Sequence, residues 1–202
     1  MSRFILGIPT LCRYDLLERL LAGVPQSTLL PREVCVIDNG RSFTPPASYP
    51  IPLTVVRPPH NLGVAASWNL LGRMYRPADL VMCNDDVAVH RDSFSRLLAA
   101  DADLVIGDNF SFFLQREGAW RAIGEYDEEF WPAYWEDTDY TVRIQRLGAA
   151  VRTAQLPPLV HHDTSSTGCG TLAQAWFERN GWLFANKWGL RDPAGPLRLP
   201  AS

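Results

Sequence analysis

The sequence predicts an α/β fold in which a mostly parallel central sheet lies between two layers of helices. Three observations lead to this fold class. Short apolar runs, typical of strands covered on both faces, alternate with longer segments of helical periodicity. Two of these runs end directly in acids and amides. The chain has 202 residues, which is enough for one such domain with a substantial core.

The first half of the chain predicts the order strand, helix, strand, strand, helix, strand. Pro9 is expected to end the first strand, Gly23 to end the first helix, and Asn61 to cap the second helix. This alternation is typical of parallel, nucleotide-binding sheets, whose ligands bind beyond the carboxyl ends of the strands. The strands are expected at residues 3–8, 33–37, 51–56 and 79–83, and the helices at about 16–23 and 62–75.

Polar side chains follow two of these strands. Asp38 and Asn39 come after the second strand, and Asn84, Asp85 and Asp86 come after the fourth. Two adjacent carboxylates repel when they are buried without a partner, and a divalent cation or a polar ligand would neutralise them. Oxygen ligands suit Mg²⁺ or Mn²⁺ better than zinc. The alternative at each strand end is an ordinary turn, but acids and amides at two such ends favour a pocket.

The second half predicts a helix that begins at Glu136 and ends before Gly148. Glu136, Asp137 and Asp139 fall in its first turn, where the helix dipole alone favours acids. The same dipole keeps a carboxylate ionised, as a general base requires. Further helices are expected at 92–99 and 171–188, and strands at 104–106, 110–115 and 150–156. Most aromatic side chains of the last helix are expected to pack against the sheet, with one or two at its rim available to stack on a sugar.

Two adjacent histidines, His161 and His162, follow the last strand. Because they point in different directions, at most one of them is expected to reach a given site. A lone histidine is more often structural than a ligand. The acidic metal candidate upstream favours a ligand role for one of the two.

Composition sets broad limits on the class of protein. The net charge of −3 gives no electrostatic footprint for nucleic acid, although it does not exclude a local basic groove. The four cysteines form no C-x-x-C pair; Cys35 and Cys83 lie inside apolar runs, and the cytoplasm is the expected compartment. We recognise neither a signal peptide nor an apolar run long enough to span a membrane. Residues 192–202 are expected to form a loose tail.

Five stretches then occur in one order along the chain. They are 36–40 (Val-Ile-Asp-Asn-Gly), 61–65 (Asn-Leu-Gly-Val-Ala) with Asn69, 84–86 (Asn-Asp-Asp), 124–148 with Trp135-Glu136-Asp137, and His161 followed by 166–168 (Ser-Thr-Gly). In this order and spacing the chain resembles family 2 glycosyltransferases of the GT-A fold, and within them the rhamnosyltransferase-like group. The similarity extends from residue 5 to about residue 189. It implies a Rossmann-like three-layer sandwich.

The resemblance implies roles for the donor-side residues. Asp38 is similar to the acid that binds the nucleotide base or ribose, and the donor pocket would also include Thr10, Asn39, Asn61, Gly63 and Asn69. Asn84-Asp85-Asp86 is similar to the D-x-D motif, with Asp86 on the metal and Asp85 on the ribose or a metal-bound water. The first motif position is Asn84 instead of aspartate, which removes one negative ligand.

The resemblance also implies roles in the second half of the chain. Asp137, of the Glu136-Asp137 pair, would be the catalytic base. His161 would be the metal-associated histidine, because its distance to residues 166–168 fits the family better than that of His162. Tyr134 and Trp135 would contact the acceptor.

The implied activity is that of a metal-dependent, inverting hexosyltransferase that uses Mn²⁺ or Mg²⁺. It would move a sugar from a dTDP- or UDP-sugar to an acceptor hydroxyl on a glycan. One domain would cover residues 1–191, with about 1–83 binding the nucleotide and 84–191 serving the acceptor and catalysis. The alternative is an inactive nucleotide-sugar-binding or scaffolding domain, against which Asp86 and the Glu136-Asp137 pair argue. A nucleotidyltransferase would begin with a Gly-rich basic loop, which residues 7–13 are not.

Overall fold

A computed structural model describes residues 4–162 and 172–190, so the predicted tail and the Ser-Thr-Gly stretch at 166–168 lie outside the described residues. The strands of the larger sheet are β1 (Phe4–Thr10), β2 (Glu33–Asp38), β3 (Leu53–Val56), β4 (Asp79–Cys83), β6 (Leu104–Asp108), β7 (Phe112–Gln115) and β8 (Thr153–Gln155). The helices are α1 (Tyr14–Gly23), α2 (Gly63–Tyr75), α3 (Ser93–Ala99), α4 (Glu117–Ile123), α5 (Glu136–Leu147) and α6 (Ala173–Trp188). Short 3₁₀ helices are η1 (Val24–Gln26), η2 (Glu128–Phe130) and η3 (Gly148–Ala150).

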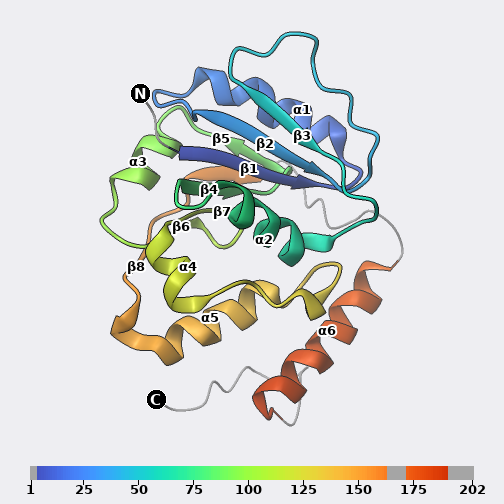
Figure 1. Cartoon of the computed structure of the whole chain (residues 1–202), viewed down its shortest axis with the longest axis vertical. Coiled ribbons are helices and arrows are strands. Elements are labelled where there is room, and N and C mark those ends of the chain that lie inside the picture. Colours follow the sequence, from blue (N-terminus) through green and yellow to red (C-terminus); the bar gives the residue numbers. More distant parts are fainter. Residues whose placement is uncertain (1–3, 163–171, 191–202) are drawn as a thin grey trace.

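The seven strands of the central sheet lie in the order β3-β2-β1-β4-β7-β6-β8 (Figure 1). Within this described sheet β7 pairs antiparallel with β4 and β6, and the remaining pairs are parallel. A second, two-stranded sheet pairs β5 (Val87–Val89) with β9 (Val160–His162). The mostly parallel α/β architecture predicted from the sequence is therefore confirmed.

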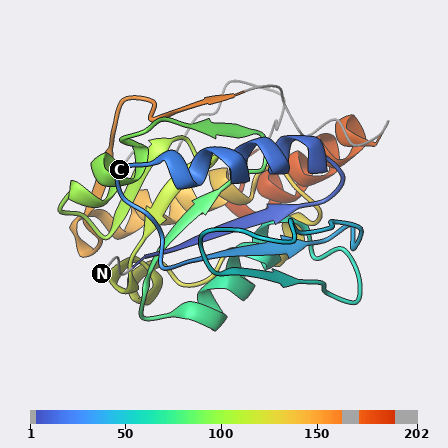
Figure 2. The ribbon, with the colours of Figure 1, turned by 90° about the horizontal axis from the view of Figure 1, so that it is seen from above.

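The core has two parts, one on each face of the central sheet. Phe4, Leu6 and Ile8 of β1 point to the face covered by α1 and α3, where they pack in one buried cluster. Ile5 points to the opposite face, where it joins a cluster from α2, α4 and α5. This alternation follows from the two-residue period of a strand, and it gives the three layers seen edge-on in Figure 2.

Three details differ from the sequence prediction. The first strand continues through Pro9 to Thr10. The Thr10 carbonyl accepts from the Asn39 N–H at 2.9 Å, so the backbone polar groups of Thr10 point toward β2. Those of Pro9 point to the opposite edge of β1, toward β4. There the pairing with β4 has already ended at Gly7, so the missing N–H of Pro9 breaks no ladder bond. The helix α4 and the β5–β9 pair were not predicted at all.

Two other expectations can be compared with the described residues. Cys35 and Cys83 are buried free thiols, as their apolar runs predict. Within the described ranges, no helix is both long and apolar enough to cross a bilayer.

Candidate active site

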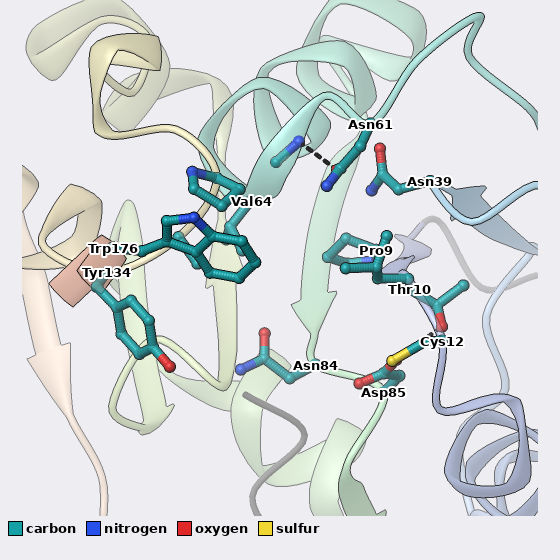
Figure 3. A pocket seen from close by; sticks show the side chains of 14 residues that line it. Pro9, Thr10, Cys12, Asn39, Asn61, Val64, Asn84, Asp85, Tyr134 and Trp176 are labelled. Atoms are coloured by element: carbon teal, nitrogen blue, oxygen red, sulfur yellow. Dashed lines mark hydrogen bonds between the residues drawn. The ribbon is translucent and has the colours of Figure 1, made fainter. Parts of the chain in front are cut away.

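The carboxyl ends of β1, β2 and β4 meet the start of α2 around a first cavity of about 130 Å³. Figure 3 shows Tyr134 and Trp176 on one side of this cavity, with Asn39, Asn61 and Thr10 opposite them. The walls are Pro9, Thr10, Leu11, Cys12, Asn39, Asn61, Gly63, Val64, Asn84, Asp85, Pro132, Ala133, Tyr134 and Trp176. The pocket expected beyond these strand ends is therefore present, and it combines amides and a carboxylate with aromatic rings.

Hydrogen bonds between elements position the polar side of the first cavity. The Thr10 hydroxyl of β1 donates to Asp85 Oδ2 at 2.7 Å, which joins the ends of β1 and β4. Asn39 accepts from the Leu62 N–H at 2.9 Å and donates to the Ser67 hydroxyl at 3.0 Å, which joins the end of β2 to α2. Because these side chains are buried and mutually bonded, the cavity is largely organised before any ligand arrives.

The start of α2 forms the floor between the two sides. Gly63 has φ of +78°, a conformation that favours glycine, and its N–H donates to Asn61 Oδ1 at 2.9 Å. The next residue, Val64, donates its N–H to the Pro132 carbonyl at 2.8 Å. A Cβ on Gly63 would lie 2.6 Å from that carbonyl oxygen, so the close approach of the loop also requires glycine.

A second cavity of about 470 Å³ adjoins the first, because Val64, Asn84, Ala133 and Tyr134 line both. Its walls further include Trp68, Asn109, Phe110, Ser111, Trp135, Glu136, Asp137, Thr138, His162 and Phe177. We refer to these two adjoining cavities together as the cleft; Asp85 lines the first, and Glu136 and Asp137 line the second.

The two acids of the second cavity begin α5. Tyr134 and Trp135 precede them with φ of 75° and 74°, an uncommon left-handed conformation for two consecutive non-glycine residues. Asp137 is half-buried, and its Oδ1 accepts from the Thr138 N–H at 2.7 Å and from the Thr138 hydroxyl at 3.2 Å. Glu136 is only 6% exposed, and burial, followed by the charge of Asp137, raises its pKa to about 8.

The last helix holds the loop that carries these residues. The buried Asn180 of α6 donates to the carbonyls of Phe130 at 2.9 Å and Ala133 at 2.8 Å. Trp135 donates its indole N–H to the Phe177 carbonyl at 3.0 Å. Sequence reasoning missed the role of Asn180, because a single asparagine in a helix carries no local signal of the carbonyls it will meet. Of the aromatic residues on α6, Trp176 and Phe177 line the cleft. The expectation that most of them pack against the sheet is wrong, because Phe184 packs against Phe130 and Val142 and Trp182 is exposed.

Two residues predicted for donor binding make hydrogen bonds within the protein. Asp38 is fully buried, and its carboxylate accepts from the Tyr14 hydroxyl at 2.8 Å and from the backbone N–H groups of Arg41 and Phe43 at 2.8 and 3.1 Å, with the Arg57 guanidinium 3.4 Å away. Asn69 bonds both backbone groups of Tyr126 and thereby fastens the 126–128 segment. Neither side chain is among those that line the two cavities.

The structure also separates the members of two adjacent pairs. Asp85 lines the first cavity, whereas Asp86 lines neither of the two. His162 lines the second cavity, and its Nε2 is hydrogen-bonded to Asp108 Oδ2 at 2.6 Å. The centroid of the His161 ring instead lies 4.3 Å from that of the His90 ring. Side chains of successive strand residues point to opposite faces, so only one histidine of the pair faces the cleft.

A divalent cation fits the oxygen donors of the first cavity. Asn84 and Asp85 present an amide and a carboxylate there. Among residues 4–162 and 172–190, no group of three or more His, Cys, Asp or Glu side chains is gathered to hold a metal ion. Mg²⁺ is often held by one or two carboxylates together with substrate phosphates and water. A cation here would accordingly depend on ligands that the substrate brings.

Comparison with known proteins supports the fold. No family model matches the sequence, and no match was found among curated proteins. The structure of the mannosyltransferase PcManGT from Pyrobaculum calidifontis, in complex with GDP-Man and Mn²⁺, is similar with a TM-score of 0.66 and 16% identity; the match covers 96% of this chain and 66% of that one. Residues 1–349 of TarS from S. aureus, in complex with UDP-GlcNAc, give 0.66 and 11%, covering 100% and 68%.

A third similar structure is glucosyl-3-phosphoglycerate synthase from Mycobacterium tuberculosis in complex with Mn²⁺, UDP and glucosyl-3-phosphoglycerate. Its TM-score is 0.63 at 14% identity, and the match covers 95% of this chain and 81% of that chain. The chain has the GT-A fold of these glycosyltransferases. It spans 66% and 68% of the two structures above, so those proteins contain substantial parts that have no counterpart here.

Proposed function

We propose that this chain is a metal-dependent, inverting glycosyltransferase that moves a sugar from a nucleoside diphosphate sugar to an acceptor hydroxyl. The observation that carries the proposal is the shared cleft. Asn84 and Asp85 face its first cavity, Glu136 and Asp137 face its second, and Asn84 and Tyr134 line both. This arrangement would place a diphosphate beside one carboxylate and a sugar beside another. The GT-A fold agrees with it.

The first cavity would hold the nucleoside diphosphate. Asn39, Asn61 and Thr10 supply hydrogen-bonding groups there, and the rings of Tyr134 and Trp176 can stack on a base or sugar. Asn84 and Asp85 would hold Mn²⁺ or Mg²⁺ together with diphosphate oxygens. When bound, the cation neutralises the charge of the diphosphate leaving group. Asp38, whose carboxylate is hydrogen-bonded to Tyr14 and to backbone N–H groups, would hold the end of β2 in place. Asn39 would then make the direct contact with the nucleotide.

The second cavity would hold the transferred sugar and the acceptor hydroxyl. Asp137 would take the proton of that hydroxyl as the oxygen attacks the anomeric carbon. One C–O bond forms, the bond to the diphosphate breaks, and the proton remains on Asp137. A single direct displacement inverts the anomeric configuration. A base in this role contributes a factor of about 10²–10⁴ in rate.

The donor and acceptor are the finer parts of the proposal. The similar structures were solved with GDP-Man, UDP-GlcNAc or UDP, and the sequence resemblance adds dTDP-rhamnose. The second cavity contains the aromatic rings of Phe110, Trp135 and Phe177. Aromatic side chains of this kind suit the apolar faces of a sugar ring, so a glycan hydroxyl is the acceptor that the cleft favours.

The proposal is tested by incubating the protein with UDP-, GDP- and dTDP-sugars and a panel of glycan acceptors. We expect released nucleoside diphosphate with Mn²⁺ or Mg²⁺, and none after chelation with EDTA. Asp85→Asn should weaken Mn²⁺-dependent binding of the matching nucleoside diphosphate by roughly tenfold or more, which is at least about 1.4 kcal/mol.

Asp101→Asn is a matched control for this variant, because the Asp101 side chain is 93% exposed and pairs with Arg152 outside the cleft. Binding of a donor without turnover of any acceptor would favour a non-catalytic sugar-nucleotide-binding domain. Release that is unaffected by EDTA would contradict the metal assignment.

A further inference from the structure

A third cavity, of about 490 Å³, lies between α5 and the edge of the central sheet. It meets the second cavity at Asn109, Phe110, Asp137 and Thr138, which line both. Among the described residues it shares no lining residue with the first cavity, so the second cavity lies between the other two. Its volume is within the range of roughly 300–1,000 Å³ that is usual for small-molecule sites. The diphosphate and the sugar proposed above occupy the other two cavities, which leaves this one to a further ligand.

Strand pairing decides which side chains form the sheet side of the third cavity. Leu104 and Ile106 of β6 pair with Thr153 and Gln155 of the edge strand β8, and all four line the cavity. Side chains of paired residues point to the same face of a sheet, because successive residues alternate between its faces. Leu104 and Ile106 are buried, whereas Thr153 and Gln155 are exposed. The floor along β6 is therefore apolar, and the rim along β8 carries a hydroxyl and an amide.

The helix side of the third cavity combines the same two kinds of surface. Val142 and Ile144 of α5 contribute apolar groups, and Thr138 and Thr141 contribute hydroxyls. The Thr141 hydroxyl donates to the Asp137 carbonyl oxygen at 2.9 Å and keeps its lone pairs for a further donor. A helix face that served only to cover a sheet would be apolar along its length. Hydroxyl and amide groups on both walls suit a ligand that has hydroxyl groups and apolar patches of its own, as a sugar ring does.

The charge of the walls narrows the class of ligand. Asp137 is the only ionisable side chain among the described residues that line the third cavity. Arg152, directly before Thr153, pairs with Asp101 and Asp103 and is not part of the lining. Phosphate and carboxylate groups are usually bound by arginine or lysine, and the charge of Asp137 would repel them. The walls therefore fit an uncharged ligand.

We propose that the third cavity binds an uncharged glycan acceptor, whose reacting hydroxyl lies beside Asp137 at the junction with the second cavity. That this glycan is the acceptor rests on the proposed function, whereas its binding between α5 and β8 does not. The nucleoside diphosphate, the transferred sugar and the acceptor then occupy the three cavities in sequence. Asp137 lines both of the last two, which is where a base must lie to take the proton of an acceptor hydroxyl as its oxygen attacks the sugar. Thr153 and Gln155 would set the specificity for the acceptor.

The first experiment measures binding and does not depend on turnover. Amide signals of the ¹⁵N-labelled protein are followed by NMR during titration with uncharged methyl glycosides and disaccharides, and with glucuronic acid and glucose 6-phosphate as charged counterparts. We expect uncharged sugars to shift the signals of Thr141, Thr153 and Gln155, and the charged sugars to bind there at least about tenfold more weakly. If no sugar shifts these three signals, or if the charged sugars bind there more tightly, the proposal is wrong.

The second experiment measures turnover with a donor and a glycan acceptor that the wild type uses. Gln155→Trp places a large ring over the exposed rim and should raise the KM for the acceptor by about tenfold or more, while the KM for the donor and its slow hydrolysis by water change by less than about twofold. Thr153→Trp should act in the same way from the neighbouring position on this face. Gln26→Trp is the matched control, because Gln26 is exposed in η1, which follows α1 on the opposite face of the sheet.

The outcomes separate this proposal from the proposed function. An acceptor KM that is unchanged in both tryptophan variants would exclude the third cavity as the acceptor site and leave the glycosyltransferase intact. Equal losses of donor hydrolysis and of transfer, in variants whose circular dichroism spectra match the wild type, would also contradict a role confined to the acceptor. If the wild type turns over no donor, the proposed function fails and the acceptor role fails with it. The NMR titration still decides whether an uncharged glycan binds between α5 and β8.

Discussion

Two buried carboxyl groups, at the end of β2 and at the start of α5, lie in very different environments. Asp38 is 0% exposed, and three hydrogen bonds and the Arg57 guanidinium satisfy its carboxylate. Glu136 is 6% exposed, and its Oε2 lacks a hydrogen-bond partner in the described part of the chain. Both follow the polar pattern that marks a site in the sequence, yet the first organises a loop and the second faces a cavity. The two acids therefore differ in their partners, although both are buried.

The same contrast occurs within α5 itself. Asp139 is 0% exposed and is bound by Arg143, Lys187 and the Trp188 indole N–H. Asp137, two residues earlier, is half-buried and lines the second cavity. Residues two positions apart on a helix point to different sides, so one acid ties α5 to α6 while the other reaches the cleft.

The largest expected effects come from substituting each of these two aspartates by asparagine. Asp137→Asn should lower kcat by about 10²–10⁴, because the amide cannot accept the proton of the acceptor. Its free energy of unfolding should change by less than about 0.5 kcal/mol. Asp139→Asn should instead destabilise the fold by about 3 kcal/mol, because it leaves two cations without their buried partner. Turnover assays combined with urea denaturation measure both quantities. If Asp137→Asn retains wild-type turnover, the base lies elsewhere.

The next effect concerns the stability of the Glu136 region as a function of pH. Because its pKa in the folded state is about 8 and the ordinary value is 4.5, the folded protein binds an additional proton between these values, and wild-type stability falls as the pH rises through that window. Glu136→Gln removes this penalty. We expect the variant to gain at most about 5 kcal/mol relative to the wild type between pH 4 and pH 9, since each unit between the pKa values of about 8 and 4.5 corresponds to about 1.4 kcal/mol.

Urea denaturation of both proteins at pH 4, 7 and 9 measures this difference. Glu129→Gln is the matched control, because Glu129 is exposed. A stability difference that does not change with pH would place Glu136 among the satisfied acids, and the contrast with Asp38 would disappear.

A smaller effect is expected at the other carboxyl group of the comparison. Asp38→Asn keeps one acceptor oxygen but removes the charge that faces Arg57 and the backbone of residues 41–43. We expect a loss of about 3 kcal/mol in the free energy of unfolding, since hydrogen bonds to a charged group contribute about 1.5–3 kcal/mol. Nucleotide affinity should fall much less than stability. A variant that is fully stable but has lost nucleotide binding would return Asp38 to the direct role that the sequence resemblance implies.

Local signals account for the parts of the fold that the sequence predicted well. The apolar run of β4 and the start of α5 at Glu136 agree with the structure to the residue, because an apolar run and a first turn rich in acids are encoded locally. Helix α4 was missed, although Ala119, Trp120 and Ile123 have helical spacing. The three-residue strands β5 and β9 depend on pairing with a segment about 70 residues away, which no local pattern reveals.

The candidate site was predicted less completely, for a related physical reason. Sequence identifies the chemistry of Asp85-Asp86 and His161-His162 but not which member of each pair faces a cavity, because that depends on strand direction and pairing. The structure brings Asp85 and His162 to the cleft. The hydrogen-bond partners of Asp38 and Asn69 could not be predicted from the sequence either, because these partners lie 3 to 59 positions away in the chain.

The smallest expected effect is at the contact between the start of α2 and the loop that precedes α5. Gly63 at the start of α2 has φ of +78°, and a Cβ there would meet the Pro132 carbonyl oxygen at 2.6 Å. Gly124→Ala is a matched control, because Gly124 has a similar φ of +85° but open space around a Cβ. Both variants should lose about 1 kcal/mol of stability to backbone strain. Gly63→Ala should lose roughly 1 kcal/mol more and also weaken nucleotide binding, because the loop at Pro132 and Tyr134 must move away from the first cavity. Equal losses in the two variants, with unchanged nucleotide affinity, would mean that the contact between α2 and this loop does not hold the cleft in shape.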